Sequence, residues 1–183
     1  CSSDLTNQYI LSLDADEVLT PQLQKSILTV KENNIADGYS FNRLNNYCGK
    51  WIKHCGWYPD VKLRLWNKEK GTWGGTNPHD TFIMNEGATV KHLSGDLQHY
   101  SYYEIEEHKK QADYFSTIAA QAYLDKGKRS SWLKIVFSPI IKFIKSYVIQ
   151  LGVLDGYYGF VVCRIASYET YMKYTKLYKL QKS

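Results

Sequence analysis

The sequence predicts an α/β fold, with part of a Rossmann-like sheet in the first hundred residues and a helical extension after it. Two observations support this prediction. Within residues 9–44 a short apolar run, a helix signal and a second apolar run follow one another. From residue 102 onward, apolar residues recur at helical spacing. A chain of 183 residues is long enough for one domain, or for a partial domain with an extension.

The opening segment predicts a strand, a helix and a second strand. Residues 9–13 are an apolar run that stops at the acids of Asp14-Ala15-Asp16-Glu17. Thr20 and Pro21 have the residue types of a helix N-cap and first turn. The expected apolar face of this helix comprises Leu23, Ile27, Leu28 and Val30. Residues 39–44 form the second predicted strand, and the strand–helix–strand order implies parallel strands.

Residues 45–99 are rich in Gly, Trp, Asn and Pro, and we expect loops and short strands that shape a cleft. Residues 61–66 alternate as a half-exposed strand would, and residues 89–93 are a further candidate strand. We therefore assign residues 1–100 to a domain part that binds metal, diphosphate and acceptor.

Residues 101–183 form the predicted helical, basic extension. Residues 102–125 and the stretch that begins at Trp132 have helical apolar spacing, and a last helix is expected over residues 160–180. The segment between Gly152 and Gly159 predicts a break. No uninterrupted apolar run approaches the roughly 18–20 residues that span a bilayer.

Charge is unevenly distributed along the chain. Residues 1–125 carry 12 basic and 16 acidic residues, whereas residues 126–183 carry 11 and 2. A basic tail with an apolar stripe is typical of a helix that lies at the surface of an anionic membrane. The alternative is a helix packed on its own domain with its lysines in water. We expect no nucleic-acid partner, because no recognised binding module is present.

Two acids follow the first predicted strand at its carboxyl end, where open α/β sheets bind ligands. Asp14 and Asp16 are two residues apart, and two close carboxylates repel each other unless a cation lies between them. Mg²⁺ or Mn²⁺ prefers such oxygen ligands and shares them with phosphates. The alternative is an acidic turn in which Asp16 or Glu17 caps the following helix.

This segment, followed by Pro21 and a helix, resembles the DxD segment of family 2 glycosyltransferases of the GT-A fold. Further stretches resemble the branch that contains the lipopolysaccharide-core β-glucosyltransferases. These stretches are Phe41-Asn42-Arg43, residues 47–52, residues 56–60, Arg64-Leu65-Trp66, His79-Asp80, residues 99–102, Lys142-Phe143, Gly152, Leu154-Asp155-Gly156 and Gly159-Phe160.

The resemblance implies inverting transfer of a sugar from a nucleotide-sugar donor, a UDP-sugar, to a glycan or lipid-linked acceptor in envelope polysaccharide or lipopolysaccharide synthesis. It also implies Mg²⁺ or Mn²⁺ and a cytoplasmic protein, peripheral at the inner-membrane surface. In related enzymes, strands that hold the base and ribose precede the DxD strand. We expect the present sequence to lack them, to start at an internal cut without a signal peptide, and to bind nucleotide sugar weakly alone.

Inversion requires a carboxylate that takes the proton of the acceptor hydroxyl. Asp80 follows a Gly-rich loop, at a position where related enzymes commonly have His-Glu, and it is the favoured base. Asp60, beside Trp57 and Tyr58, is the second candidate.

Several other residues are predicted to bind substrate or metal. Arg43 and Arg64 would contact phosphate, since a guanidinium fits it bidentately, or would pair with local carboxylates instead. Asp14 would reach the diphosphate through the metal, Trp57 would stack on a sugar, and His79 lies beside the favoured base. His99 would complete the metal shell.

Two other functions remain open from the sequence. A phosphatase of the haloacid-dehalogenase type also places DxD after an apolar strand, with the first Asp as nucleophile. Its further acids and lysine have only a poor match here, at Gly95-Asp96. The second alternative is a non-enzymatic module that binds a membrane or a polyanion.

Overall fold

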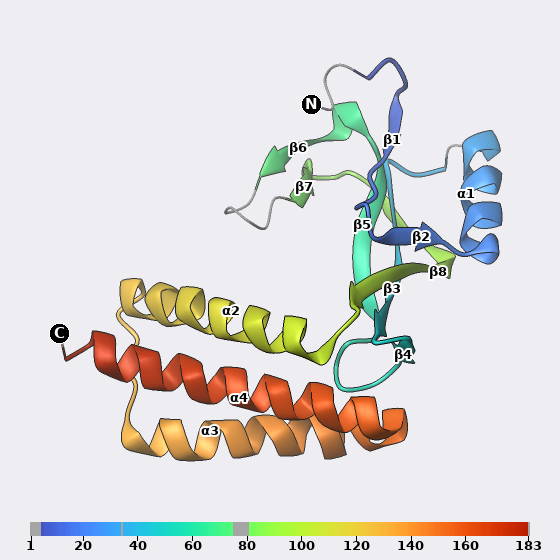
Figure 1. The fold of residues 1–183 in the computed structure, drawn as a ribbon. Helices are drawn as coiled ribbons and strands as arrows, with labels where there is room; N and C mark the ends of the chain where they lie inside the picture. Colours follow the sequence, from blue (N-terminus) through green and yellow to red (C-terminus); the bar gives the residue numbers. More distant parts are fainter. Residues whose placement is uncertain (1–4, 34, 75–80, 183) are drawn as a thin grey trace. The chain divides into compact units, whose positions relative to one another are not determined.

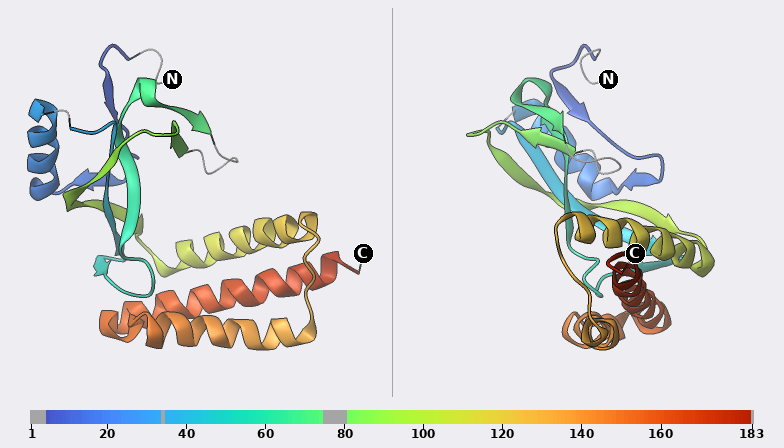
Figure 2. Two further views of the ribbon diagram at one scale, coloured as in Figure 1. Left: turned by 180° about the vertical axis from the view of Figure 1, so that it is seen from behind. Right: turned by 90° about the vertical axis from the view of Figure 1, so that its left-hand side faces the viewer.

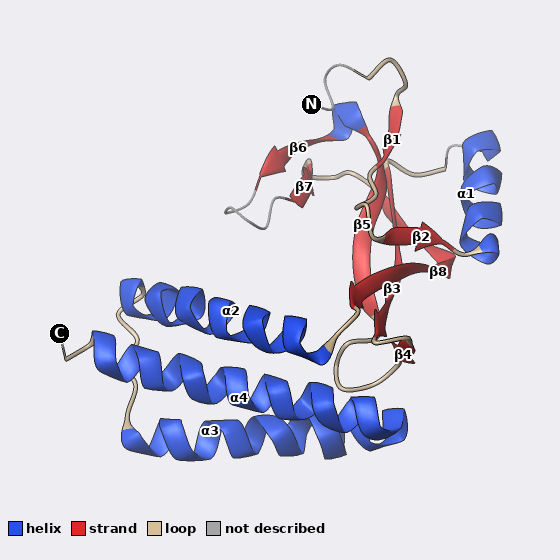
Figure 3. Ribbon diagram, in the orientation of Figure 1, coloured by secondary structure: helices blue, strands red, loops and turns tan. Residues whose placement is uncertain are grey.

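The computed structural model describes residues 5–33, 35–74 and 81–182. The chain divides into two compact units (Figure 1). The first unit comprises residues 1–44 and 59–99, and the second comprises residues 45–58 and 100–183. Within the described residues the fold class is mixed α/β, with a mixed sheet and four α-helices, as predicted for a partial Rossmann-like fold with a helical C-terminal extension (Figure 3).

The main sheet is mixed, because β3 and β8 run parallel: the Gly38 amide donates to the Thr89 carbonyl at 2.9 Å where both strands begin, and the Cys48 amide donates to the Tyr102 carbonyl at 2.8 Å where both end. β1 pairs antiparallel with β5, and β5 pairs antiparallel with β3. β1 and β3 therefore run in the same direction, as expected, but they are not neighbours, because β5 lies between them. The strand order is β1 (Tyr9–Leu11), β5 (Asp60–Asn67), β3 (Gly38–Tyr47), β8 (Val90–Tyr102) and β2 (Glu17–Leu19), and β4 (Lys50–Ile52) pairs with β3.

Helix α1 (Pro21–Asn33) packs on the sheet of the first unit. The Thr20 hydroxyl accepts a hydrogen bond from the Leu23 amide at 3.3 Å, so Thr20 caps the helix as predicted. Leu23 and Val30 are buried in the core, and Ile27 packs against it. Leu28 was expected on the same face, but it is 61% exposed.

Around β5, the buried residues Ile10, Trp66 and Phe82 form a second small core. Trp66 is buried and stacks on Phe82 of β7 (Thr81–Met84), with ring centroids 4.5 Å apart. Trp73 of β6 (Gly71–Gly74) meets both rings edge-on. β6 pairs antiparallel with β7, and the short 3-10 helix η2 (Lys68–Lys70) precedes them. The Trp66 side chain therefore contributes to the packing of this core.

In the second unit, α4 packs against both α2 and α3 and lies between them (Figures 1 and 2). α3 continues into a π-helical turn, η3, and η4 is the 3-10 turn that precedes α4. The last helix therefore begins at Gly156, four residues before the predicted start. The helical bounds are α2 (Ile105–Asp125), α3 (Trp132–Ile144), η3 (Lys145–Ile149), η4 (Gly152–Asp155) and α4 (Gly156–Leu180).

Residues 45–58 are tied to the start of α4 by the buried carboxylate of Asp155. This carboxylate accepts hydrogen bonds from the amides of Lys53 and His54 at 3.3 and 2.8 Å, and it pairs with His54 Nδ1 at 2.9 Å. Close packing reinforces the junction, since a Cβ on Gly152 would lie 2.9 Å from Cys55 Sγ. These contacts join the loop to the helices although about a hundred residues separate them.

Helix α3 has no buried residue. Ile135, Val136 and Phe143 are half-buried, whereas its other large apolar residues are exposed, and exposed apolar residues continue through η3 and η4 into α4. This exposed apolar surface comprises Trp132, Leu133, Phe137, Ile140, Ile141, Ile144, Val148, Ile149, Leu151, Val153, Leu154, Tyr157 and Phe160.

Within the described part of the chain, no single helix is long and apolar enough to cross a membrane. By length and composition alone, the pair formed by Trp132–Ile149 and Gly152–Leu180, which is bent by 71°, passes that test together.

Candidate functional site

The acids after β1 lie in a turn that leads into β2. The Glu17 amide donates to the Asp14 carbonyl at 3.0 Å, and the Asp14 amide donates to Glu17 Oε2 at 3.1 Å. The carboxylates of Asp14 and Asp16 are 56% and 46% exposed, whereas that of Glu17 is fully buried. Neither Asp16 nor Glu17 caps α1, because Thr20 does so. The turn therefore presents two acids to solvent and one to the interior.

Arg64 binds the first and third of these acids. The Ser12 amide donates to the Arg64 carbonyl at 2.8 Å, which holds β5 beside the end of β1. From there Arg64 Nη2 reaches Asp14 Oδ2 at 2.5 Å and Glu17 Oε1 at 2.6 Å. Burial opposes the charge of Arg64, but the carboxylates of Glu17 and Asp14 outweigh it and raise the pKa of the guanidinium. Arg64 is therefore charged and fixed in position.

A second arginine lies beside the first. β3 and β5 pair Arg43 with Asp60 in register, and Arg43 Nη2 lies 2.8 Å from Asp60 Oδ2. The other Asp60 oxygen, Oδ1, lies 3.0 Å from Lys62 Nζ. Arg43 Nη1 is also 3.5 Å from Glu17 Oε1, so the buried Glu17 lies between the two guanidinium groups. Both oxygens of Asp60 thus face cations.

His99 completes the cluster from β8. The pairing of β2 with β8 sets Glu17 opposite His99, and His99 Nε2 lies 3.2 Å from Asp16 Oδ2. Burial and the charge of Arg43 lower the pKa of His99, although Asp16 and Glu17 act in the other direction. The lowered pKa favours the neutral ring, which is the form of histidine that binds metal ions.

The fit of this cluster to a divalent metal rests on its donor atoms. Among the described residues, no three His, Cys, Asp or Glu side chains are already arranged around a common metal position. Asp16 and His99 do lie together, and Asp14 pairs with Arg64 from a largely exposed position. Carboxylate oxygens and a neutral imidazole are ligands for Mn²⁺. The chemistry of the donor set therefore fits the predicted metal, which stays a prediction.

The structure brings together six of the predicted site residues, all in the first unit: Asp14, Asp16, Arg43, Asp60, Arg64 and His99. Trp57 belongs to the second unit, where it packs edge-on against Tyr47 and His108 in an aromatic cluster. His79 and Asp80 lie outside the described residues.

Sequence reasoning gave Glu17 no role beyond helix capping. A signal was present, because in a strand over Glu17–Leu19 the first and third residues share a face. That alternation places Glu17 on the inner face of β2 with Leu19. A buried acid of this kind requires cationic partners, and Arg43 and Arg64 supply them.

Comparisons with known proteins give relatives at low identity. No family model matches the chain, and no solved structure matches it. An uncharacterized glycosyltransferase of Rickettsia typhi is 26% identical over 184 residues, which cover 95% of this chain and 63% of the relative. A similar protein of Rickettsia prowazekii is 26% identical, with 93% and 62% covered.

The lipopolysaccharide core biosynthesis glycosyltransferase LpsC of Rhizobium meliloti is 25% identical over 117 residues, which cover 64% of this chain and 43% of that protein. The chain thus spans less than two thirds of the length of these curated relatives. Along nearly all of its own length, the chain is related to proteins named glycosyltransferases.

Proposed function

We propose that the protein to which this chain belongs transfers a sugar from a UDP-sugar to a glycan or lipid-linked acceptor, with inversion, in the synthesis of envelope polysaccharide or lipopolysaccharide. The cluster in which Arg64 joins Asp14 to the buried Glu17 carries this proposal. It holds two arginines and the two exposed acids of the DxD segment at the carboxyl end of β1, where α/β sheets bind ligands. The names of the relatives point to the same class of reaction.

The cluster is suited to a leaving diphosphate. Asp14, Asp16 and His99 would hold Mg²⁺ or Mn²⁺, which supplies charge neutralisation for the departing phosphates. Glu17 is the positioning residue, because its buried carboxylate lies between the guanidinium groups of Arg43 and Arg64. A phosphate that binds at Arg64 would replace the exposed Asp14 as its partner, while Glu17 keeps the guanidinium oriented.

Asp80 is the base that we propose. A base must have an oxygen available for the proton of the acceptor hydroxyl. Asp60 is less suited to this role, since its Oδ2 accepts from Arg43 and its Oδ1 faces Lys62. Asp60 instead orients Arg43 in our proposal, and Trp57 remains a candidate for contact with the acceptor sugar.

Of the two acceptor classes, glycan and lipid-linked, the exposed apolar surface favours the lipid-linked one, because this surface would dock on the cytoplasmic face of the inner membrane. Thirteen large apolar side chains between Trp132 and Phe160 are exposed, which exceeds what scattered surface residues would give. Lys134 and Lys145 are exposed on the same helical segment, and each cation near an anionic surface adds about 1 kcal/mol. Donor binding requires no such surface, so the surface supports a membrane-bound acceptor.

A sugar-transfer assay of the full-length protein tests the proposal. The protein is incubated with radiolabelled UDP-sugars, Mn²⁺ and an extract of envelope lipids, and labelled product is separated from donor. We expect transfer that chelation of the metal abolishes and that Asp16→Asn lowers by about 10²-fold or more, the scale of lost electrostatic stabilisation. Glu86→Gln, an exposed acid outside the cluster, is the matched control. Transfer that persists unchanged in Asp16→Asn would refute the role of the DxD acids.

A further inference from the structure

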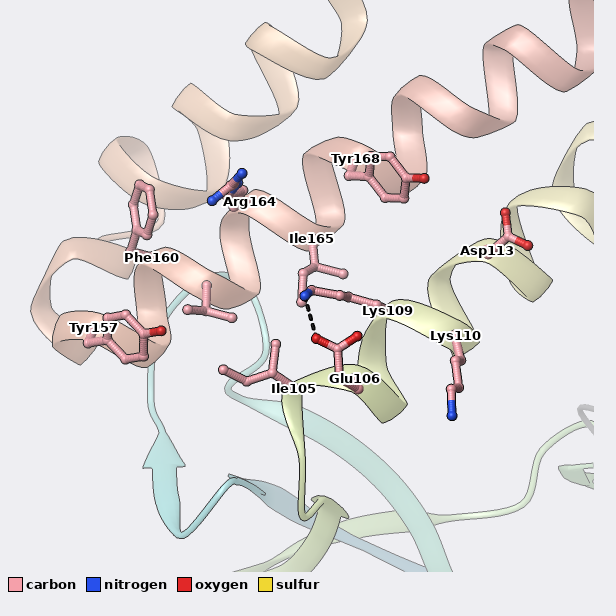
Figure 4. Close-up of a pocket in the computed structure, with 11 residues that line it drawn as sticks. Ile105, Glu106, Lys109, Lys110, Asp113, Tyr157, Phe160, Arg164, Ile165 and Tyr168 are labelled. Atoms are coloured by element: carbon pink, nitrogen blue, oxygen red, sulfur yellow. Dashed lines mark hydrogen bonds and ion pairs between the residues drawn. The ribbon is translucent and has the colours of Figure 1, made fainter.

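The first turns of α4 face two different surroundings. On one side, Tyr157, Phe160 and Arg164 line a groove of about 840 Å³ with α2 (Figure 4). Arg164 and Lys110 point away from each other there, so they offer no common site for an anion (Figure 4). Cys163 directly precedes Arg164 but does not line this groove, and it is fully buried. The buried side of α4 therefore carries a thiol that the chemistry proposed for the first unit does not use.

A second buried thiol meets Cys163 from residues 45–58. Cys55 and Cys163 are both buried, and their thiols form a hydrogen bond with each other. Gly152 leaves the room that this pair needs, because a Cβ there would lie 2.8 Å from Cys163 Sγ and 2.9 Å from Cys55 Sγ. The two sulfur atoms therefore lie close to one common point, although they are far apart in the sequence. Both residues belong to the second unit.

Their surroundings make the two thiols chemically different. The hydrogen bond from Cys55 lowers the pKa of the Cys163 thiol, and the charge of Lys142 acts in the same direction, although burial opposes both. The same hydrogen bond, together with burial, raises the pKa of the Cys55 thiol. A thiolate, not a thiol, is the nucleophile in cysteine chemistry. Cys163 is thus the nucleophile of the pair, and Cys55 is its protonated partner.

Cys55 is held beside Cys163 in a strained backbone conformation. Its φ of 62° lies in the left-handed region, which a residue with a side chain rarely adopts. The Cys55 amide donates to the Gln150 carbonyl at 3.1 Å, and Cys55 Sγ lies 3.8 Å from Asp155 Oδ2. Such strain persists only where surrounding contacts fix the residue. These contacts keep the Cys55 thiol next to its partner.

We propose that Cys55 and Cys163 form a redox switch, in which a peroxide converts the two thiols to a disulfide that joins residues 45–58 covalently to α4. The Cys163 thiolate attacks one oxygen of hydrogen peroxide, the O–O bond breaks, and a sulfenic acid and hydroxide form. The hydroxide takes up the proton that the Cys163 thiol released. The Cys55 sulfur then attacks the sulfenic sulfur, the S–O bond breaks, and the Cys55 proton leaves with the hydroxyl group as water. Two thiols and one peroxide thus give one disulfide and two water molecules.

Burial sets the pace of this reaction. Oxidation of a thiol depends on its exposure as well as its pKa. Gly56, which follows Cys55, is exposed, so the pair lies just beneath the surface of residues 45–58. We expect oxidation each time that this segment opens transiently, and hence a slow reaction. The inference concerns the second unit alone, and failure of the sugar-transfer assay would leave it unchanged.

Peptide mapping of the full-length protein tests the switch. The reduced protein is treated with millimolar hydrogen peroxide, the remaining thiols are blocked with iodoacetamide, and tryptic peptides are identified by mass spectrometry. We expect a pair of peptides joined through Cys55 and Cys163, which dithiothreitol separates. We also expect the oxidised protein to melt roughly 5 °C or more above the reduced protein, because a disulfide that closes a long loop restricts the unfolded chain.

Three variants control this experiment. Cys48→Ser removes the half-buried thiol of the same segment and is expected to keep both the linked peptides and the rise in melting temperature. Cys55→Ala and Cys163→Ala are each expected to lose both. The linked peptides are measured in the wild type, so the test does not depend on the folding of either alanine variant.

The inference would be overturned if prolonged peroxide treatment of the folded wild type gave no peptides joined through Cys55 and Cys163. Linkage through Cys48 in their place, or linkage that forms only after unfolding in urea, would overturn it equally.

Discussion

Glu17 is the residue around which the candidate site is organised. Its carboxylate is fully buried, and it contacts Arg64, Arg43 and the Asp14 amide. A buried carboxylate is stable only when cations and hydrogen bonds compensate for its lost hydration. The two arginines are therefore structural partners of Glu17 as well as candidate phosphate ligands.

Replacement of Glu17 by glutamine is expected to destabilise the first unit. The change removes the charge that both guanidinium groups face, but Asp14 and Asp60 still pair with them. We expect a loss of about 1–3 kcal/mol in the free energy of unfolding, measured by urea titration. Glu86→Gln changes an exposed acid and is expected to stay within about 0.5 kcal/mol of the wild type. Equal stability of the two variants would show that Glu17 does not organise the cluster.

The two candidate bases are separated by their kinetic signatures. Asp80→Asn in the full-length enzyme is expected to lower kcat by roughly 10²-fold or more, the scale for loss of a general base. Asp60→Asn keeps a hydrogen-bonding group beside Arg43 and is expected to lower kcat less and to raise the KM for the donor. Steady-state rates at varied donor concentration measure both values. A near-normal kcat for Asp80→Asn would remove Asp80 from the role.

At the scale of single residues, the sequence predicts the turn that carries Asp14 and Asp16 but not the contacts that its residues make. The apolar run before Asp14 and the spacing of Asp14 and Asp16 locate the turn correctly. Pairing within the cluster depends on contacts across the sheet, such as Glu17 opposite His99 in β2 and β8. Residues about eighty positions apart meet there, and no local pattern specifies that meeting.

Helix α3 is the element whose surface most needs an explanation. Six of its apolar side chains are exposed, although burial of each would contribute roughly 1.5–3 kcal/mol. Among the described residues, nothing covers Phe137 or Ile141 fully, since they are 54% and 63% exposed. Docking on a membrane would remove this surface from water.

Vesicle flotation tests the membrane role of α3. Phe137→Ser/Ile141→Ser is expected to weaken binding to phosphatidylglycerol vesicles by about tenfold or more, because less apolar surface enters the interface. Tyr114→Ser/Ile118→Ser, which changes exposed apolar residues of α2, is the matched control and is expected to float like the wild type. Unaltered flotation of the α3 variant would count against docking through this surface.

Helix α2 carries a group that makes the stability of the second unit depend on pH. His108 is buried beside Tyr47, with Nδ1 3.1 Å from the tyrosine hydroxyl, and burial lowers its pKa to about 4. An unfolded histidine binds a proton near pH 6.5, so the unfolded state takes up the proton first as pH falls. Stability is therefore lost between about pH 6.5 and about pH 4, and is unaffected by this group above pH 7.

His108→Gln removes this titration. We expect the wild type to lose on the order of 2 kcal/mol between pH 7 and pH 4.5 from this group, and the variant to lack that loss. Urea midpoints of both proteins across this range measure the difference. His92→Gln, which changes an exposed histidine, is the control and should keep the wild-type slope. Parallel pH curves for His108→Gln and the wild type would contradict the assignment.

At the scale of the whole molecule, the sequence predicts the fold class and most helices. It does not predict the full length of β8, which extends beyond residues 89–93 to Tyr102. The strand continues through Ser94-Gly95-Asp96, where Gly95 approaches α1 so closely that a Cβ would lie 2.4 Å from the Leu23 amide nitrogen. The association of residues 45–58 with the helices likewise depends on distant contacts through Asp155.

The central claim is that Asp14, Asp16 and His99 hold a divalent cation together with the diphosphate of a sugar nucleotide. Electron paramagnetic resonance of Mn²⁺ titrated into the full-length protein, with and without UDP, tests this claim most directly. The account predicts that UDP promotes Mn²⁺ binding and that Asp16→Asn abolishes this effect, whereas Glu86→Gln does not. Mn²⁺ binding that ignores UDP, or that is equal in Asp16→Asn and the wild type, would contradict it.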